Sequence, residues 1–323
     1  MNRDQRDRPK SNNQIPKPAH PQKRREPLPT SRPKPPEEDA DAPKHVAAIL
    51  ASPSYKQADQ DVDFLNRDDT RGVRLQLDYQ KTEFLLAQHR VKHTIVVFGS
   101  TRIAETGVAQ RRVEALRSAL AADPGNTELQ HGLAIAERVL AKSHYYGVAR
   151  EFGRLVGRSG SGPLDCRVVV MTGAGPGMME AANRGAHDVG AKSVGLNINL
   201  PHEQYPNPYV TPELCFRFHY FALRKLHFLL RAKALVAFPG GYGTFDELFE
   251  TLTLVQTRTI RPLPIVLVGK HYWQQAFDID FLVNEGVIDP EDRELFWFAE
   301  TADEIWRGIL HWHEVNGESL FPI

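Results

Sequence analysis

The sequence predicts an α/β fold, in which a Rossmann-like, doubly wound parallel sheet carries helices on both faces. Two observations support this expectation. Short, continuous apolar runs such as residues 94–98 are typical of parallel strands that are buried on both faces. Helical segments separate these runs at a regular pitch, as in repeated strand–helix units.

Composition limits the possible classes. The chain has 323 residues, 41% of them hydrophobic, and no net formal charge. Such a chain can bury the core of one large α/β domain or two small ones, and the neutral balance disfavours a nucleic-acid binder. No apolar run reaches membrane-spanning length, and the basic N-terminus lacks the apolar segment of a secretory signal. The two cysteines, Cys166 and Cys215, suggest neither a disulfide framework nor a zinc cluster, which fits a reducing cytoplasm.

Three regions are expected along the chain. Residues 1–44 hold ten of the 23 prolines and almost no large apolar side chains, so we expect a disordered tail. Its basic run at 23–25 could touch an acidic partner, although a solvated tail is the simpler interpretation. Residues 45–92 form a helical lead-in, and residues 93–323 form the Rossmann-like domain. In the lead-in, a short helix starts at 47–50. A longer helix at 69–90 should pack on the main domain through Val73, Leu77, Phe84 and Leu85.

The main domain should contain seven strands with helices between them. Strands are expected at 94–98, 167–171, 193–200, 214–220, 234–238, 264–268 and 296–299. Helices are expected as two segments on either side of the 123–126 turn, and at 178–189, 221–232, 244–258, 272–285 and 302–314. The four prolines of 201–212 indicate an irregular loop.

Three of these strands end in glycine-bearing turns, after Phe98, Thr172 and Phe238. Ligands of doubly wound sheets bind at the carboxyl ends of the strands, near the point where the strand order reverses. We therefore expect the three turns to line one pocket.

The stretch from Val236 to Glu250 carries the main functional signal of the sequence. An apolar strand, a glycine-rich turn and the start of an amphipathic helix together make an anion site, because the turn allows close approach and the first helical N–H groups are free. The expected anion is a phosphate. Glu247 adds a carboxylate one turn into the helix.

Several other chemistries have no visible residues. The chain lacks a G-x-x-x-x-G-K-[ST] phosphate loop, an H-E-x-x-H zinc motif and a G-x-S-x-G nucleophile elbow. The turn at 173–177 is spaced G-x-G-x-G, and the following strand carries Asn197 and Asn199 where an acidic residue would bind a ribose diol. A nicotinamide cofactor is therefore disfavoured.

Spacing alone leaves the roles of the charged residues open. Thr244 to Glu247 is a T-x-x-E sequence, which favours a capping box over catalysis. Arg224 and Lys225 could be a solvated helix face, although a parallel sheet would bring them to the same rim as the glycine loop. The turns at 99–100 and 173–177 could be simple strand-to-helix connections.

A family resemblance favours functional roles for these residues. Residues 239–247, Pro-Gly-Gly-Tyr-Gly-Thr-Phe-Asp-Glu, match the P-G-G-x-G-T-x-x-E motif of the LOG family. That family contains cytokinin riboside 5′-monophosphate phosphoribohydrolases and related nucleotide nucleosidases, once labelled "possible lysine decarboxylases". Residues 221–225 resemble its second motif, which ends in Arg-Lys, with Ala222 in place of the usual His. Residues 172–180 resemble its G-G-G-x-x-G-x-M segment, with Ala174 in place of a Gly, and residues 98–102 resemble its first strand end. The similarity runs from about residue 94 to the C-terminus, and the lead-in resembles the longer members.

The resemblance implies hydrolysis of the N-glycosidic bond of a purine nucleoside 5′-monophosphate, such as AMP or a cytokinin nucleotide, to the free base and ribose 5-phosphate. It implies Glu247 and Arg224 as catalytic residues, with no metal and no cofactor. The substrate-binding residues that it implies are Pro239, Gly240, Gly241, Gly243, Thr244, Lys225, Gly99, Ser100, Gly173, Gly175, Gly177 and Met178.

Family members associate at least as dimers, so a homo-oligomer is expected, while no nucleic-acid or membrane partner is. One alternative is a non-catalytic protein that binds a nucleotide or another phosphorylated ligand on a Rossmann-like fold. A lysine decarboxylase, as in the old label, is disfavoured because no feature marks a pyridoxal phosphate site.

Overall fold

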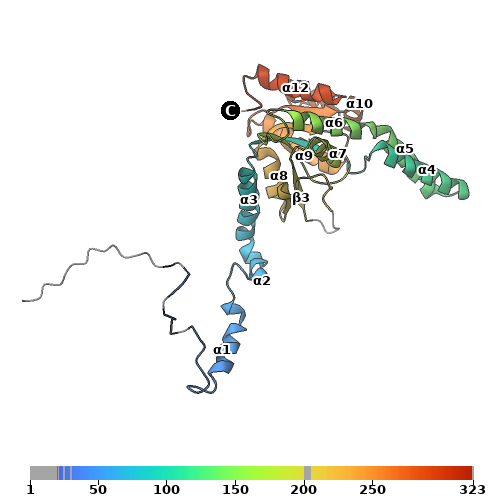
Figure 1. Cartoon of the computed structure of the whole chain (residues 1–323). Helices are drawn as coiled ribbons and strands as arrows, with labels where there is room; N and C mark the ends of the chain where they lie inside the picture. Colours follow the sequence, from blue (N-terminus) through green and yellow to red (C-terminus); the bar gives the residue numbers. More distant parts are fainter. Residues whose placement is uncertain (1–19, 21, 25, 30, 200–204, 322–323) are drawn as a thin grey trace, which may run out of the picture. The chain divides into compact units, whose positions relative to one another are not determined.

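The computed structural model describes residues 20–321, except for 21, 25, 30 and 200–204 (Figure 1). Parts of the expected tail, 1–19, 21, 25 and 30, lie outside the described residues, as do positions 201–204 of the expected loop. The chain divides into two compact units between Thr70 and Arg71. The predicted domain boundaries at 44 and 92 stay predictions.

The smaller unit contains short helices. They are α1 (Ala42–Leu50), η1 (Pro53–Tyr55), α2 (Val62–Leu65) and η2 (Asp68–Thr70). The side chain of Asp61 caps α2 by accepting a hydrogen bond from the Phe64 N–H.

The larger unit is built on a seven-stranded parallel sheet, as the sequence predicts. Its strands are β1 (His93–Phe98), β2 (Val168–Thr172), β3 (Ser193–Ile198), β4 (Cys215–Phe218), β5 (Ala232–Ala237), β6 (Ile265–Val268) and β7 (Trp297–Ala299). Their order is β4-β3-β2-β1-β5-β6-β7. Successive strands extend the sheet in one direction from β1 to β4, and β5 then pairs with the other side of β1. The order therefore reverses between β1 and β5.

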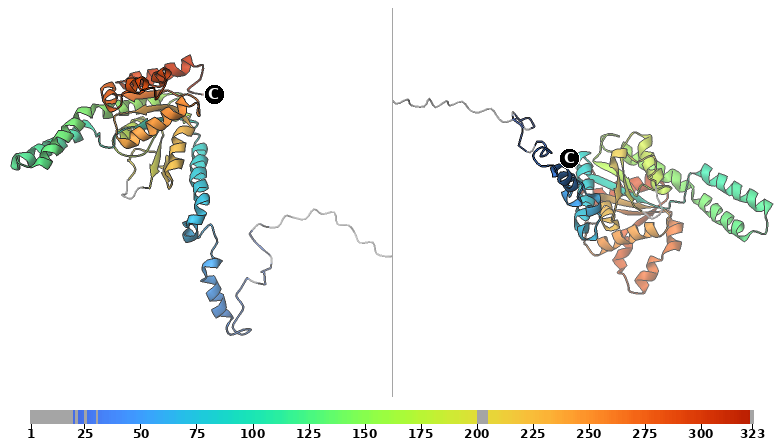
Figure 2. Two further views of the ribbon diagram at one scale, coloured as in Figure 1. Left: turned by 180° about the vertical axis from the view of Figure 1, so that it is seen from behind. Right: turned by 90° about the horizontal axis from the view of Figure 1, so that it is seen from below.

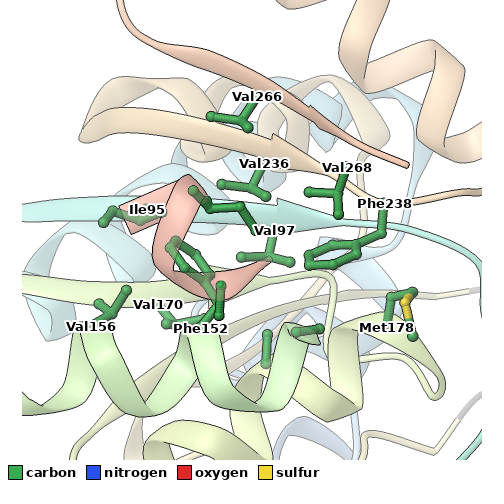
Figure 3. Close-up of a cluster of buried hydrophobic side chains, with 14 of the residues drawn as sticks. Ile95, Val97, Phe152, Val156, Val170, Met178, Val236, Phe238, Val266 and Val268 are labelled. Carbon is green, nitrogen blue, oxygen red and sulfur yellow. The ribbon is translucent and has the colours of Figure 1, made fainter. Parts of the chain in front are cut away.

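Helices cover both faces of this sheet. The helices that the structure describes in this unit are α3 (Arg71–Gln88), α4 (Thr106–Ala122), α5 (Thr127–Lys142), α6 (His144–Arg158), α7 (Met178–Asp188), η3 (Pro212–Leu214), α8 (Phe221–Leu230), α9 (Tyr242–Gln256), α10 (Lys270–Ala276), α11 (Ile279–Asn284), η4 (Pro290–Leu295) and α12 (Ala302–Val315). On one face, side chains of β1, β5 and β6 pack against α6, α7 and α12 (Figure 3). On the other face, α3, α8, α9 and α10 cover a second apolar cluster. Two-sided burial explains why the strands are continuous apolar runs.

Two predicted helices are divided. Between β1 and β2 the chain forms three helices instead of two, because α5 ends at Lys142 and α6 starts anew after Ser143. The buried Ser143 hydroxyl bonds to Thr106 at the start of α4, which fixes this corner. The α4–α5 pair projects away from the body of this unit (Figures 1 and 2). The helix expected at 272–285 is split into α10 and α11 at Asp278, whose side chain caps α11.

The contact face expected for α3 is only partly correct: Leu85 packs against the second apolar cluster, but the other three residues do not. Val73, Leu77 and Phe84 are 48%, 51% and 69% exposed, while Thr82 and Leu86 are buried. Only the last turns of α3 reach the core, because the helix extends beyond the edge of the apolar cluster that Leu86 joins. The apolar spacing of this helix correctly predicted a helix but not its buried side. No helix among the described residues is long and apolar enough to cross a membrane.

Candidate active site

A cavity of about 710 Å³ opens at the carboxyl ends of the central strands. Gly99 follows β1, Gly173 follows β2 and Gly240 follows β5, and all three line it. The cavity therefore lies where the strand order reverses, the usual ligand position in a doubly wound sheet.

The loop between β5 and α9 has its carbonyl oxygens bound by the protein. The Ser100 N–H donates to the Pro239 oxygen at 2.9 Å, and the Tyr272 hydroxyl donates to the Gly240 oxygen. The Gly241 oxygen accepts from the Thr244 and Phe245 N–H groups at 2.9 and 3.1 Å.

The N–H groups of the same loop are free. Those of residues 240–243 make no hydrogen bond to any described residue. A trans peptide points its N–H opposite to its carbonyl, so fixing three consecutive carbonyls also fixes the three N–H directions. Free N–H groups at the start of a 15-residue helix form an anion site.

The capping-box alternative for Glu247 is wrong. Helix α9 begins at Tyr242 after Gly241, and no side chain caps it. Thr244 is therefore the third helical residue, and Glu247 lies beyond the first turn. The glycines permit this early start, because a Cβ on Gly240 would lie only 2.1 Å from the Thr244 hydroxyl oxygen.

Glu247 is a buried carboxylate in the wall of the cavity. Its side chain lies on α9, and the residue is only 7% exposed. Burial raises the pKa of Glu247 from 4.5 to about 7, although the charges of Lys225 and Arg224 act in the opposite direction. Its charge is thus poised to change near neutral pH, as is typical of functional carboxylates.

Arg224, the fourth residue of α8, also lines the cavity. Its Nε donates to the Leu196 carbonyl at 3.0 Å, and its guanidinium lies 5.3 Å from the centre of the Phe228 ring. A Cβ on Gly173 would approach its Nη2 to 2.8 Å, so a glycine there makes room for the guanidinium. Burial lowers the pKa of Arg224, and the Glu247 charge raises it.

Lys225 points elsewhere. Its ammonium group binds Asp246 at 2.8 Å and Glu250 at 3.1 Å, both on α9, and it does not line the cavity. Lys225 therefore links α8 to α9 through ion pairs with Asp246 and Glu250, which lie before and after Glu247 in sequence. These pairs neutralise the two carboxylates nearest to Glu247 along the chain.

The remaining predicted residues fall into two groups. Those that line the cavity with Glu247 and Arg224 are Gly99, Ser100, Gly173, Pro239, Gly240, Gly241, Gly243 and Thr244. Gly175, Gly177 and Met178 do not line it; Met178 is fully buried in the core. The Met178 N–H donates to the Ser100 carbonyl at 3.1 Å, so the turn at 173–177 holds the loop after β1 in place.

Ala174, which replaces a glycine of the motif, is buried and adopts a left-handed conformation with φ of 58°. It does not line the cavity. Its N–H donates to the Thr172 hydroxyl at 3.0 Å and its carbonyl accepts from the Asn207 N–H at 2.8 Å. These two bonds hold the alanine in a conformation that usually favours glycine.

Sequence reasoning missed part of the wall. Met179 and Tyr272 each follow a glycine turn by a few residues, so the strand-end rule could have found them. No sequence motif marked α5 as part of the site. It nevertheless contributes Ile135, Arg138, Val139 and Lys142 to the cavity wall, and these residues share one helix face. Together with Arg102, this wall makes the cavity rim cationic. Among the described residues, no cluster of His, Cys, Asp and Glu could hold a metal ion.

Comparison with known proteins agrees with the motifs. The family described as "Possible lysine decarboxylase" matches residues 179–309. The cytokinin riboside 5′-monophosphate phosphoribohydrolase LOG3 of Arabidopsis thaliana is 31% identical over 169 residues, which cover 51% of this chain and 74% of that protein. LOG7 of the same plant, with the same enzyme name, is 34% identical over 31% of this chain and 52% of its own length.

The enzyme LOG of Oryza sativa subsp. japonica, again a cytokinin riboside 5′-monophosphate phosphoribohydrolase, is 29% identical over 51% of this chain and 65% of its length. The X-ray structure of TM1055, a structural genomics target, aligns with 68% of this chain and 99% of its own at 18% identity, with a TM-score of 0.41.

Proposed function

The chain belongs to the LOG family of cytokinin riboside 5′-monophosphate phosphoribohydrolases, and from this premise we propose that it hydrolyses the N-glycosidic bond of a purine nucleoside 5′-monophosphate. The substrate is AMP or a cytokinin-type nucleotide. The products are the free base and ribose 5-phosphate.

One observation carries the proposal: a buried carboxylate, Glu247, lies in the same cavity as a loop with free N–H groups. The loop binds the 5′-phosphate through the N–H groups of 240–243 and the α9 dipole. Anchoring the phosphate sets the position of C1′ relative to Glu247, so that binding energy far from the reacting bond supports catalysis.

The reaction breaks the bond between C1′ and the base nitrogen and forms a bond between C1′ and a water oxygen. The base leaves with the electron pair of the broken bond, so positive charge builds on the ribose. The departing base takes up one proton, which balances the proton that the attacking water loses. The Glu247 carboxylate stabilises this charge and accepts a proton from the attacking water. Arg224 binds the phosphate or the ribose hydroxyls as a donor fixed by its bond to Leu196.

The test is to incubate the purified protein with AMP, GMP, IMP and a cytokinin riboside 5′-monophosphate and to measure free base by chromatography. We expect base release from at least one purine nucleotide, and its loss in Arg224→Ala with little change in melting temperature. A thermal shift with nucleotides but no released base would instead support the non-catalytic binder.

We further propose that the chain forms a dimer through α8 and α9, next to the cavity. Apolar side chains on these helices are exposed in the single chain: Leu226 by 43%, Leu230 by 46% and Phe249 by 37%. Light scattering should give twice the chain mass for the wild type and a lower mass for Leu230→Asp. A monomeric wild type would contradict this.

A further inference from the structure

Tyr272 stands out among the cavity residues because it is not part of any motif that the sequence revealed, yet its hydroxyl contacts the anion loop directly. It lies on α10, which follows β6, and β6 pairs with β5. Its hydroxyl donates to the Gly240 carbonyl, and its ring lines the cavity.

The Tyr272 ring is held in place by its neighbour. Trp273 is fully buried, and its indole N–H donates to the Val268 carbonyl at 3.0 Å. The two rings pack edge to face, with their centres 5.4 Å apart and an angle of 85° between them. Burial raises the pKa of Tyr272, so its hydroxyl keeps the proton that it donates.

The bond to Gly240 has a geometric consequence. Three consecutive loop carbonyls are bound by the protein. Among the residues that the structure describes, those of Pro239 and Gly241 accept from backbone N–H groups, and only that of Gly240 accepts from a side chain. Because the peptide between Gly240 and Gly241 is planar and trans, its carbonyl cannot turn without turning the Gly241 N–H. A flexible Gly-Gly peptide has little else to hold it.

We propose that Tyr272 is the positioning residue for phosphate binding: its hydroxyl fixes the Gly240–Gly241 peptide so that the Gly241 N–H is oriented for the 5′-phosphate of the substrate. This inference rests on the proposed function only in naming the phosphate as that of a nucleotide. Tyr272 does not act on the glycosidic bond.

The experiment measures binding of ribose 5-phosphate by calorimetry to the wild type, Tyr272→Phe and a matched control, Tyr146→Phe. Tyr146 donates its hydroxyl to Glu180 at 2.7 Å and does not line the cavity, so the control removes a tyrosine hydroxyl and its hydrogen bond away from the cavity. We expect the Kd for ribose 5-phosphate to rise about fivefold in Tyr272→Phe, the effect of one neutral hydrogen bond, and to be unchanged in Tyr146→Phe.

Turnover separates positioning from chemistry. With a nucleotide substrate, Tyr272→Phe should raise KM by the same factor as Kd while kcat changes less. An unchanged Kd would overturn the proposal, and so would a fall in kcat with Kd and KM unchanged, since the hydroxyl would then act on the reacting atoms. If the wild type released no base, the proposed function would fail, but the calorimetry would still decide the role of Tyr272.

A second substitution tests the proposal even if Tyr272→Phe is unstable. A fluorinated tyrosine at 272 keeps the ring and hydroxyl but ionises at lower pH. Its affinity for ribose 5-phosphate, relative to the wild type, should fall as the pH rises through that ionisation, because a phenolate cannot donate to the Gly240 carbonyl. A constant ratio of affinities across the pH range would refute the proposal.

Discussion

Replacing Glu247 by glutamine tests the site through stability as well as activity. The folded protein raises the pKa of this carboxyl from 4.5 to about 7. The unfolded chain therefore loses its proton first as the pH rises. Between pH 4.5 and 7 the folded state binds more protons, so it loses stability as the pH rises through this window, and the full cost is present above pH 7.

The pKa shift of Glu247 determines how much stability the buried charge costs. Two and a half pKa units correspond to about 3 kcal/mol at 25 °C, and the carboxyl is buried enough that solvent screening does not remove most of this. Glutamine has no charge to bury. Glu247→Gln should thus be more stable than the wild type by up to about 3 kcal/mol at pH 8, and by almost nothing at pH 4.

Activity should change in the opposite direction. Without the carboxylate, kcat/KM for the best nucleotide should fall by about a thousandfold, which is typical of removing a group that stabilises charge in the transition state. The assays are urea unfolding at pH 4 and pH 8, and base release by chromatography. Glu137→Gln is the control, because Glu137 is an exposed carboxylate that pairs with Arg117.

Two outcomes would refute this reasoning. Near-normal turnover in Glu247→Gln would show that the carboxylate is not catalytic. A variant less stable than the wild type at pH 8 would show that the carboxylate makes a favourable interaction in the fold, as a capping residue would.

Further predictions concern the loop and the charges around it. Gly241→Ala should fold normally but weaken ribose 5-phosphate binding, because the added Cβ meets no described protein atom within 4 Å and enters the open space of the cavity. Gly240→Ala should lower the melting temperature, because the added Cβ would overlap the Thr244 side chain. Equal melting temperatures for the two variants would contradict this. Lys225→Met should move the acidic limb of the kcat–pH profile to higher pH, because an ammonium that lowers the pKa of the Glu247 carboxyl is removed. An unmoved limb would contradict the proposed role of Glu247 or its coupling to Lys225. Arg138→Ala should reduce kcat/KM for a nucleotide several-fold at low salt and less at high salt, because an exposed cation on the cavity rim attracts the anion; a loss that did not depend on salt would argue against steering.

Much of the fold could be predicted because strands buried on both faces leave a clear apolar signal. The seven strands follow from runs such as the one at 94–98, and the position of the cavity follows from the glycines at strand ends. The exposed side of α3 could not be predicted, because apolar spacing identifies a helical face but not what covers it. Val73 and Phe84 have the pattern of a buried stripe and are exposed.

The site was only partly predictable for a different reason. Motif residues near one another in sequence, such as Gly240 and Glu247, could be assigned to the same loop and helix. The α5 side chains come from an element far along the chain from the glycine turns, so only the folded arrangement brings them to the cavity. Tyr272 follows the turn at Gly269, so the position of that turn at the end of β6 was the only available signal for it. Lys225 shows the converse, since its neighbour Arg224 lines the cavity while Lys225 itself binds α9.

The start of α9 connects the proposed phosphate loop with the Glu247 carboxylate. A T-x-x-E capping box would begin the helix after Thr244, and its side chains would occupy N–H groups of the first turn. The observed start at Tyr242 leaves the N–H groups of residues 240–243 without a hydrogen-bond partner among the described residues. It also moves Glu247 past the first turn, where the charged side chains of α8 approach it. A helix that began after Thr244 would leave residues 240–243 outside it, so capping by these residues and anion binding at 240–243 require different helix starts. The close packing of Gly240 against Thr244 favours the second, so a substitution that forced the later start should remove the anion site and the buried carboxylate together.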